Sequence, residues 1–182
     1  ELGSNSLNNK EFKKEIEPLT NYSALRLIKD INSQSAGIGL FLTAVNRDLT
    51  DESMRTNFSK NSYTLGFDGW YHLDNSKEYV LYGSVLGSHV QGSHEYISQL
   101  QKSPLRYLNR PDAGFMKYDS TRSSLSGLYG WVGLNKQSGN FYLNSSIGLA
   151  TPGLEYNDLG YQTKADAIYE HVMAGYRWYT SD

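Results

Sequence analysis

The sequence has no cysteine and only four prolines in 182 residues. The lack of cysteine excludes disulfides and thiolate metal sites, and it removes redox chemistry as a guide to the compartment. No run of about 18 apolar residues occurs, which excludes a transmembrane helix. The 17 basic and 19 acidic residues give a net charge of −2, and the basic residues are scattered along the chain. We therefore expect no nucleic acid partner.

Aromatic residues and glycine are abundant, with 15 Tyr, six Phe, three Trp and 17 Gly. This bias is typical of transmembrane β-barrels, whose strands are apolar on one side only and end in aromatic girdles. Extracellular lectin-like β-sandwiches share the bias, so composition leaves both classes open.

Period-2 alternation is clearest in the stretch SYTLGFDGWYHL, residues 62–73. Leu65 and Phe67 fall on one parity, and Asp68, Trp70 and His72 fall on the other. Such alternation predicts a β-strand with one apolar face. The turn DNSKE leads into a second run of this kind, so the sequence predicts an antiparallel hairpin with strands about twice the usual length of 5–6 residues.

The same pattern recurs along the chain and predicts seven strands. The first 20 residues are polar and are interpreted as a lead-in arm, residues 47–60 as a polar loop, and residues near 94–102 as a short loop helix capped by Ser93. The predicted strands lie near residues 21–30, 36–46, 62–73, 79–90, 124–135, 140–151 and 167–179.

Short and long connections alternate strictly between these strands. INSQS, DNSKE and KQSG are short turns, whereas the connections after the second, fourth and sixth strands are long. All long loops of an antiparallel meander then lie at one end, as in outer-membrane barrels. We therefore predict an all-β, antiparallel up-and-down transmembrane β-barrel. Because bacterial single-chain barrels have an even number of strands, we expect seven or eight strands of a larger barrel.

Several phrases in a fixed order carry a family resemblance: EPLTNYSALRL, FLTAVNRDL, GSHVQGS, LQKSPLRYLNRPDAG, DSTRSSLSGLYG and PGLEYNDLGYQTKAD. From about Glu17 to its end the sequence resembles an uncharacterised outer-membrane β-barrel domain. In Gram-negative envelope proteins that domain follows a carbohydrate-binding family 9-like module. The resemblance implies an outer-membrane location, further barrel strands and a sugar-binding module in the parent protein. It supplies no catalytic residues.

The polar side of residues 62–73 is one candidate ligand site. Asp68, Trp70 and His72 share this side, and an aromatic ring can stack on a sugar ring. The alternative is that Trp70 serves in a girdle or in the packing of the sheet.

Two loop motifs are further candidates. Asn109, Arg110 and Asp112 surround a proline, and they form either a ligand site at the barrel mouth or an Arg110–Asp112 ion pair that pins the loop. In the motif NDLG, Asn157 or Asp158 can close an Asx turn. The loop acids are expected to be solvated rather than calcium-binding, since neither loop has calcium-site spacing; they are Asp48, Asp51, Glu52, Glu155 and Asp158.

No catalytic or metal-binding motif stands out. His72, His89, His94 and His171 lack zinc-site spacing. Ser123, Ser124 and Ser126 lie outside any nucleophile elbow, and no histidine is near them in sequence. We expect no metal, no cofactor and no enzyme activity.

The expected function is that of a non-enzymatic outer-membrane barrel segment in a Gram-negative bacterium. It would anchor a glycan-binding module or pass small solutes. The expected partners are outer-membrane lipid, glycan, further barrel strands and other envelope proteins. The main alternative is a soluble extracellular lectin-like β-sandwich that binds carbohydrate, and a barrel enzyme acting on lipid or glycan is the third.

Overall fold

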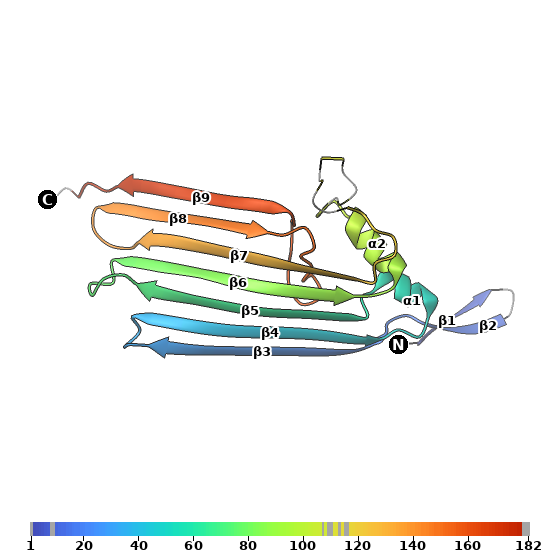
Figure 1. Ribbon diagram of the computed structural model, residues 1–182. Coiled ribbons are helices and arrows are strands. Elements are labelled where there is room, and N and C mark those ends of the chain that lie inside the picture. Colours follow the sequence, from blue (N-terminus) through green and yellow to red (C-terminus); the bar gives the residue numbers. More distant parts are fainter. Residues whose placement is uncertain are drawn as a thin grey trace.

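The computed structural model describes residues 2–7, 10–106, 108, 111–112, 114 and 117–179, with the backbone alone for residues 2–15. Its main body is one open antiparallel sheet of seven strands in sequence order (Figure 1). The strands are β3 (Leu19–Ile31), β4 (Ala36–Asp48), β5 (Asn61–His72), β6 (Tyr79–Gln91), β7 (Ser124–Lys136), β8 (Phe141–Ala150) and β9 (Ala167–Tyr176). The predicted seven antiparallel up-and-down strands are confirmed, and every strand end lies within three residues of the expected position.

The connections separate into a turn end and a loop end of the sheet, as the sequence predicts (Figure 1). The short connections are residues 32–35, 73–78 and 137–140, and the long ones are 49–60, 92–123 and 151–166. Both helices lie at the loop end: α1 (Glu52–Asn57) and α2 (His94–Lys102). No helix in the described part of the chain is long and apolar enough to cross a membrane.

Two elements differ from the expectation. The loop 47–60 contains α1, which begins because the Asp51 carboxylate accepts a hydrogen bond from the backbone N–H of Ser53 at 2.7 Å. Six residues are too few to show helical periodicity. The lead-in contains a separate two-stranded hairpin, β1 (Leu2–Leu7) with β2 (Lys10–Glu15). Its polar sequence has no alternation that would predict a strand.

The antiparallel register places each strand parity on one side of the sheet. Leu65 and Phe67 of β5 point to the side that we term the apolar face, and Asp68 and Trp70 point to the polar face. On the apolar face many aliphatic side chains, drawn from all seven strands, are 38–80% exposed; among them are Leu25, Leu27, Ile38, Leu42, Leu65, Leu81, Val85, Leu128, Val132, Ile147, Leu149, Ile168 and Val172.

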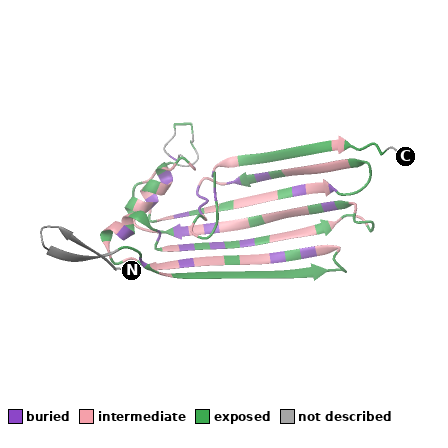
Figure 2. Cartoon of the chain, turned by 180° about the vertical axis from the view of Figure 1, so that it is seen from behind, coloured by how far each residue is buried: buried purple, intermediate pink, exposed green. Residues whose placement is uncertain are grey.

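The polar face is covered at the loop end only. Ile97 of α2 packs against Val90 and Leu125 of the sheet, and Leu154 of the 151–166 loop packs against Ala150. The edge strands β3 and β9 are exposed along almost their whole length (Figure 2). The small core therefore lies beneath the long loops, and the rest of the sheet is uncovered on both faces.

The β5–β6 turn depends on one carboxylate. Asp74 accepts hydrogen bonds from the Ser76 hydroxyl and from the backbone N–H groups of Tyr79, at 2.8 Å, and Glu78, at 3.0 Å. These bonds, with that of Ser76 the largest contribution, lower the pKa of Asp74 to about 2. Because the pKa is lower in the folded turn, the stabilisation is complete above the ordinary carboxyl pKa of 3.8 and is lost as the pH falls through 2.

A carboxyl ¹³C NMR titration of Asp74 should therefore give a midpoint near 2. The substitution Ser76→Ala should move the midpoint upward, because it removes the largest of the stabilising hydrogen bonds. A midpoint near 3.8 in the unmodified protein would contradict this description of the turn.

Candidate functional site

The 151–166 loop, which we term the strap, crosses the polar face from β8 towards β4. Thr151 exchanges hydrogen bonds with the backbone of Leu128 on β7, and the backbone N–H of Glu155 donates to the Ser88 hydroxyl on β6 at 3.0 Å. A Cβ at Gly127 would lie 2.1 Å from the backbone nitrogen of Leu154. Glycine at this position is therefore required for the strap to lie against the sheet.

The first ion pair of the strap joins it to β4. Asp158 Oδ1 lies 2.5 Å from Arg47 Nη2, and its other oxygen accepts from the Ser59 hydroxyl at 2.8 Å. The Arg47 and Asp158 side chains are only 8% and 14% exposed. Asp158 thus pairs with two residues that precede it by about 100 positions. Sequence spacing alone therefore could not predict that Asp158 attaches the strap to β4 and to the 49–60 loop.

A second ion pair joins the strap to the segment that follows α2. Glu155 Oε2 lies 2.5 Å from Arg106 Nη2, and the two side chains are 5% and 0% exposed. Arg106 also donates to the carbonyl oxygens of Leu100 and Leu154, each at 2.8 Å. Because removal of one partner would leave a buried charge unpaired, this pair should be strongly coupled to the fold of the loop end.

Tyr96 of α2 lies beside both ion pairs. Its hydroxyl hydrogen-bonds to Ser59, and burial, followed by the negative charges of Asp158 and Glu155, raises the pKa of Tyr96 far above its ordinary value of 10. The phenol therefore stays neutral at any physiological pH and acts as a hydrogen-bonding and packing group.

Glu155 and Asp158 were expected to be solvated, and this expectation is wrong. Both are held in ion pairs, and Glu155 also accepts from the backbone N–H of Asn157 at 3.0 Å. The Asn157 side chain accepts from the backbone N–H of Gln162 at 2.8 Å, so it closes the strap on itself over five residues. Asn157 and Asp158 thus hold the strap in place, and a ligand-binding role for them stays a prediction.

Of the other loop candidates, the structure describes some and not others. Asn109 and Arg110 lie outside the described residues, so the expected Arg110–Asp112 pair stays a prediction. Asp112 itself is exposed. Asp51, another of the loop acids, caps α1.

The sheet brings the remaining candidates together at the turn end of the polar face. Asp68 binds the Arg26 guanidinium through both oxygens, with Nη2 to Oδ1 at 2.8 Å. Trp70 follows two residues later on the same face, and His72 Nδ1 lies 3.3 Å from the Ser35 carbonyl oxygen. Sequence reasoning found three of these residues but missed Arg26, which lies two strands away from Asp68.

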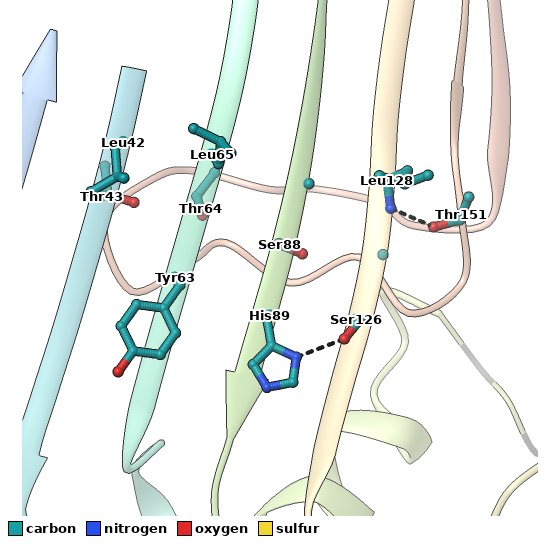
Figure 3. Close-up of a pocket in the computed structure, with 12 residues that line it drawn as sticks. Leu42, Thr43, Tyr63, Thr64, Leu65, Ser88, His89, Ser126, Leu128 and Thr151 are labelled. Atoms are coloured by element: carbon teal, nitrogen blue, oxygen red, sulfur yellow. Dashed lines mark hydrogen bonds between the residues drawn. The ribbon is translucent and has the colours of Figure 1, made fainter. Parts of the chain in front are cut away.

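A groove of about 550 Å³ lies on the apolar face near the loop end, where Gly87 has no side chain (Figure 3). Leu65 and Leu128 line it, and His89 Nδ1 lies 2.7 Å from the Ser126 hydroxyl at its polar end. Sequence spacing missed this contact because the two residues are on neighbouring strands. No carboxylate hydrogen-bonds to His89 among the residues that the structure describes, and no group of three metal-ligating side chains occurs among them either.

A protein-family model described as a domain of unknown function, DUF5916, matches residues 3–182. The chain belongs to this family. The DUF5916 match begins earlier than the expected resemblance and includes the lead-in with the hairpin β1–β2. No curated protein and no solved structure matches the chain.

Removing the buried carboxylate of the strap should destabilise the loop end. We expect Glu155→Gln to lower the free energy of unfolding by about 3–5 kcal/mol, because Arg106 would be left buried without its counter-ion. The matched control is Arg122→Gln, which removes an ion pair with Asp119 whose two side chains are 36% and 45% exposed. That change should cost less than about 1 kcal/mol. Equal effects of the two substitutions in denaturant unfolding would contradict the role assigned to the strap.

Proposed function

We propose that the sheet is a section of the wall of a membrane-spanning β-barrel in the outer membrane of a Gram-negative bacterium. In this role it is non-enzymatic, and it anchors a glycan-binding module or passes small solutes. The apolar face contacts lipid, and the polar face lines the interior.

The exposure of the apolar face is the observation that carries this proposal. Aliphatic side chains on seven adjacent strands share one face, and every strand contributes at least one that is 38–80% exposed. Soluble monomers rarely expose a contiguous apolar patch of more than a few hundred Å². An apolar surface that extends over seven strands must be covered, and a lipid bilayer is a cover that suits one face of a single sheet.

The arrangement of aromatic side chains supports the same conclusion. On the apolar face, Tyr71, Tyr79, Phe141 and Tyr176 lie at the turn end, and Tyr63 lies towards the loop end. Tyr63 and Tyr71 are separated by about 27 Å of strand at 3.4 Å per residue. The apolar band of outer-membrane barrels is about 25 Å tall and is flanked by aromatic girdles.

The two sheet edges indicate what completes the wall. β3 and β9 are the first and last of seven alternating strands, so they run in the same direction. Closure by antiparallel pairing alone therefore requires an odd number of further strands between them. Glu170 of β9 lies exposed on the apolar face and on an open edge. A carboxylate facing lipid is unfavourable, so we expect the strand beside β9 to supply a hydrogen-bond donor to it.

The soluble lectin-like sandwich is the alternative. It requires a second sheet packed about 10 Å from the apolar face. Within the described residues, the only other strands form the β1–β2 hairpin, which is too small to cover seven strands. The sandwich would need that second sheet from another chain or another segment.

The His89–Ser126 contact favours a second candidate function, hydrolysis of a lipid ester in the groove. A serine nucleophile needs an adjacent base and a group that orients the base. The described residues supply the base, but no carboxylate that orients it. We therefore expect that a fluorophosphonate probe leaves Ser126 unmodified, as judged by mass spectrometry. Labelling of Ser126 that is abolished by His89→Ala would establish the enzyme instead.

Adjacent residues on β6 provide a direct test of the membrane proposal. Val85 lies on the apolar face and Ser84 on the polar face. Val85→Arg should destabilise the membrane-inserted protein by about 2–4 kcal/mol, the cost of arginine at the bilayer midplane. Ser84→Arg, the matched control, should change stability by less than 1 kcal/mol, because its charge would face water.

Stability would be measured by denaturant unfolding in lipid vesicles, after membrane flotation shows where the unmodified protein resides. Recovery of the unmodified protein in the soluble fraction without detergent would overturn the membrane proposal and favour the sandwich.

A further inference from the structure

Several aromatic rings on the polar face lie against the sheet, each over a glycine of the neighbouring strand. A Cβ at Gly37 would lie 2.1–2.5 Å from three ring atoms of Trp70, and a Cβ at Gly66 would lie 2.2 Å from two ring atoms of Phe41. Gly37 and Gly66 are in direct register with these aromatics. Each ring therefore occupies the space that a side chain on the next strand would take, and each remains partly exposed.

Two more rings extend this surface towards β7. The ring of Tyr82 lies over Gly133, where a Cβ would be 2.9 Å from its Cζ atom. Trp131 meets Tyr82 edge to face, with ring centroids 5.1 Å apart. We term Phe41, Trp70, Tyr82 and Trp131 the aromatic platform. It spans β4 to β7, and it lies outside the part of the polar face covered by α2 and the strap.

Hydrogen-bonding groups lie within this surface. Gly39 is what allows Arg26 and Asp68 to meet across β4, since a Cβ at Gly39 would be 2.7 Å from both side chains. Their pairing uses two of the five donors of the guanidinium and leaves acceptor lone pairs on each carboxylate oxygen. The Arg26 and Asp68 side chains are 43% and 28% exposed, so a ligand can reach them.

Cover of glycine by an aromatic ring also has a purely structural use, because it stabilises strand pairs that contain glycine. That use accounts for the position of each ring. It does not account for a charged pair placed beside Trp70, where a small apolar side chain would serve packing equally well.

We propose that the aromatic platform, together with Arg26 and Asp68, binds carbohydrate. A pyranose ring has an apolar face of C–H groups that stacks on an aromatic ring and a rim of hydroxyl groups that donate and accept hydrogen bonds. Phe41, Trp70 and Tyr82 offer ring faces for stacking, Trp131 supports Tyr82 edge to face, and the Arg26–Asp68 pair offers donors and acceptors beside them. The ligand class that matches both is a linear neutral oligosaccharide. This inference rests on the proposed function in one respect, since the polar face must be open to water.

The test is titration calorimetry of the purified protein with maltohexaose and cellohexaose. Trp70→Ala should weaken binding about tenfold, which corresponds to about 1.4 kcal/mol. The double variant Gly37→Ala with Trp70→Ala places a methyl group where the ring lay and restores the cover of the strand pair. Affinity should stay low in the double variant, because no stacking surface returns.

Tyr142 provides the matched control. Its ring lies over Gly175 in the same way, but the guanidinium of Arg177 is stacked on it at 5.0 Å from the ring centroid. Tyr142→Ala should therefore leave oligosaccharide affinity unchanged. Recovery of affinity in the double variant, or an equal loss in Tyr142→Ala, would assign the rings a structural role and overturn the inference.

The outcomes also separate this inference from the proposed function. A protein that floats with membranes but binds neither oligosaccharide would overturn the carbohydrate site alone. A soluble protein that binds them through Trp70 would overturn the membrane wall and support the lectin-like alternative.

Discussion

The structure depends on one constraint, which is that a broad apolar face must be kept from water although none of the residues with described side chains covers it. Burial of apolar surface stabilises proteins by roughly 25 cal/mol per Å², so leaving the side chains of seven strands in water would be strongly unfavourable. This constraint accounts for which side chains lie on the apolar face and which lie on the polar face. The apolar face carries exposed aliphatic side chains. Its charged residues lie near strand ends or on an edge strand; they are Lys29, Asp48, Lys136 and Glu170.

The side chains of the polar face are covered in different ways at the two ends of the sheet. At the loop end, the strap and α2 cover it, and the buried charges of Arg47 and Arg106 are matched by Asp158 and Glu155 at 2.5 Å. At the turn end, the rings of Trp70 and Tyr82 lie over glycines and remain partly exposed. Glycine has a specific use in both places, because Gly127 admits the strap backbone and Gly37 admits an indole ring.

Local patterns predicted the sheet well, because alternation and turn residues are properties of neighbouring positions. Gly139 of KQSG has the positive φ, 82°, that the turn requires. The turn INSQS was predicted only by its polarity, and it places Asn32, Ser33 and Gln34 in the left-handed region without any glycine. The candidate sites were harder to predict. Asp68, Trp70 and His72 share a face by parity alone, whereas the partners of Asp158 and Ser126 come from distant segments that only the folded sheet brings together.

The central claim is that the apolar face of the sheet contacts lipid. The chain has no cysteine, so spin labels can be attached at single cysteines introduced in turn at residues 62–71 of β5. Collision rates with oxygen, which partitions into lipid, and with a water-soluble nickel complex would then be measured in lipid vesicles. The account predicts high oxygen access at residues 63, 65, 67, 69 and 71 and low access at the residues between them. Uniform access to the nickel complex along the strand, or protection of the odd positions from both reagents, would contradict it.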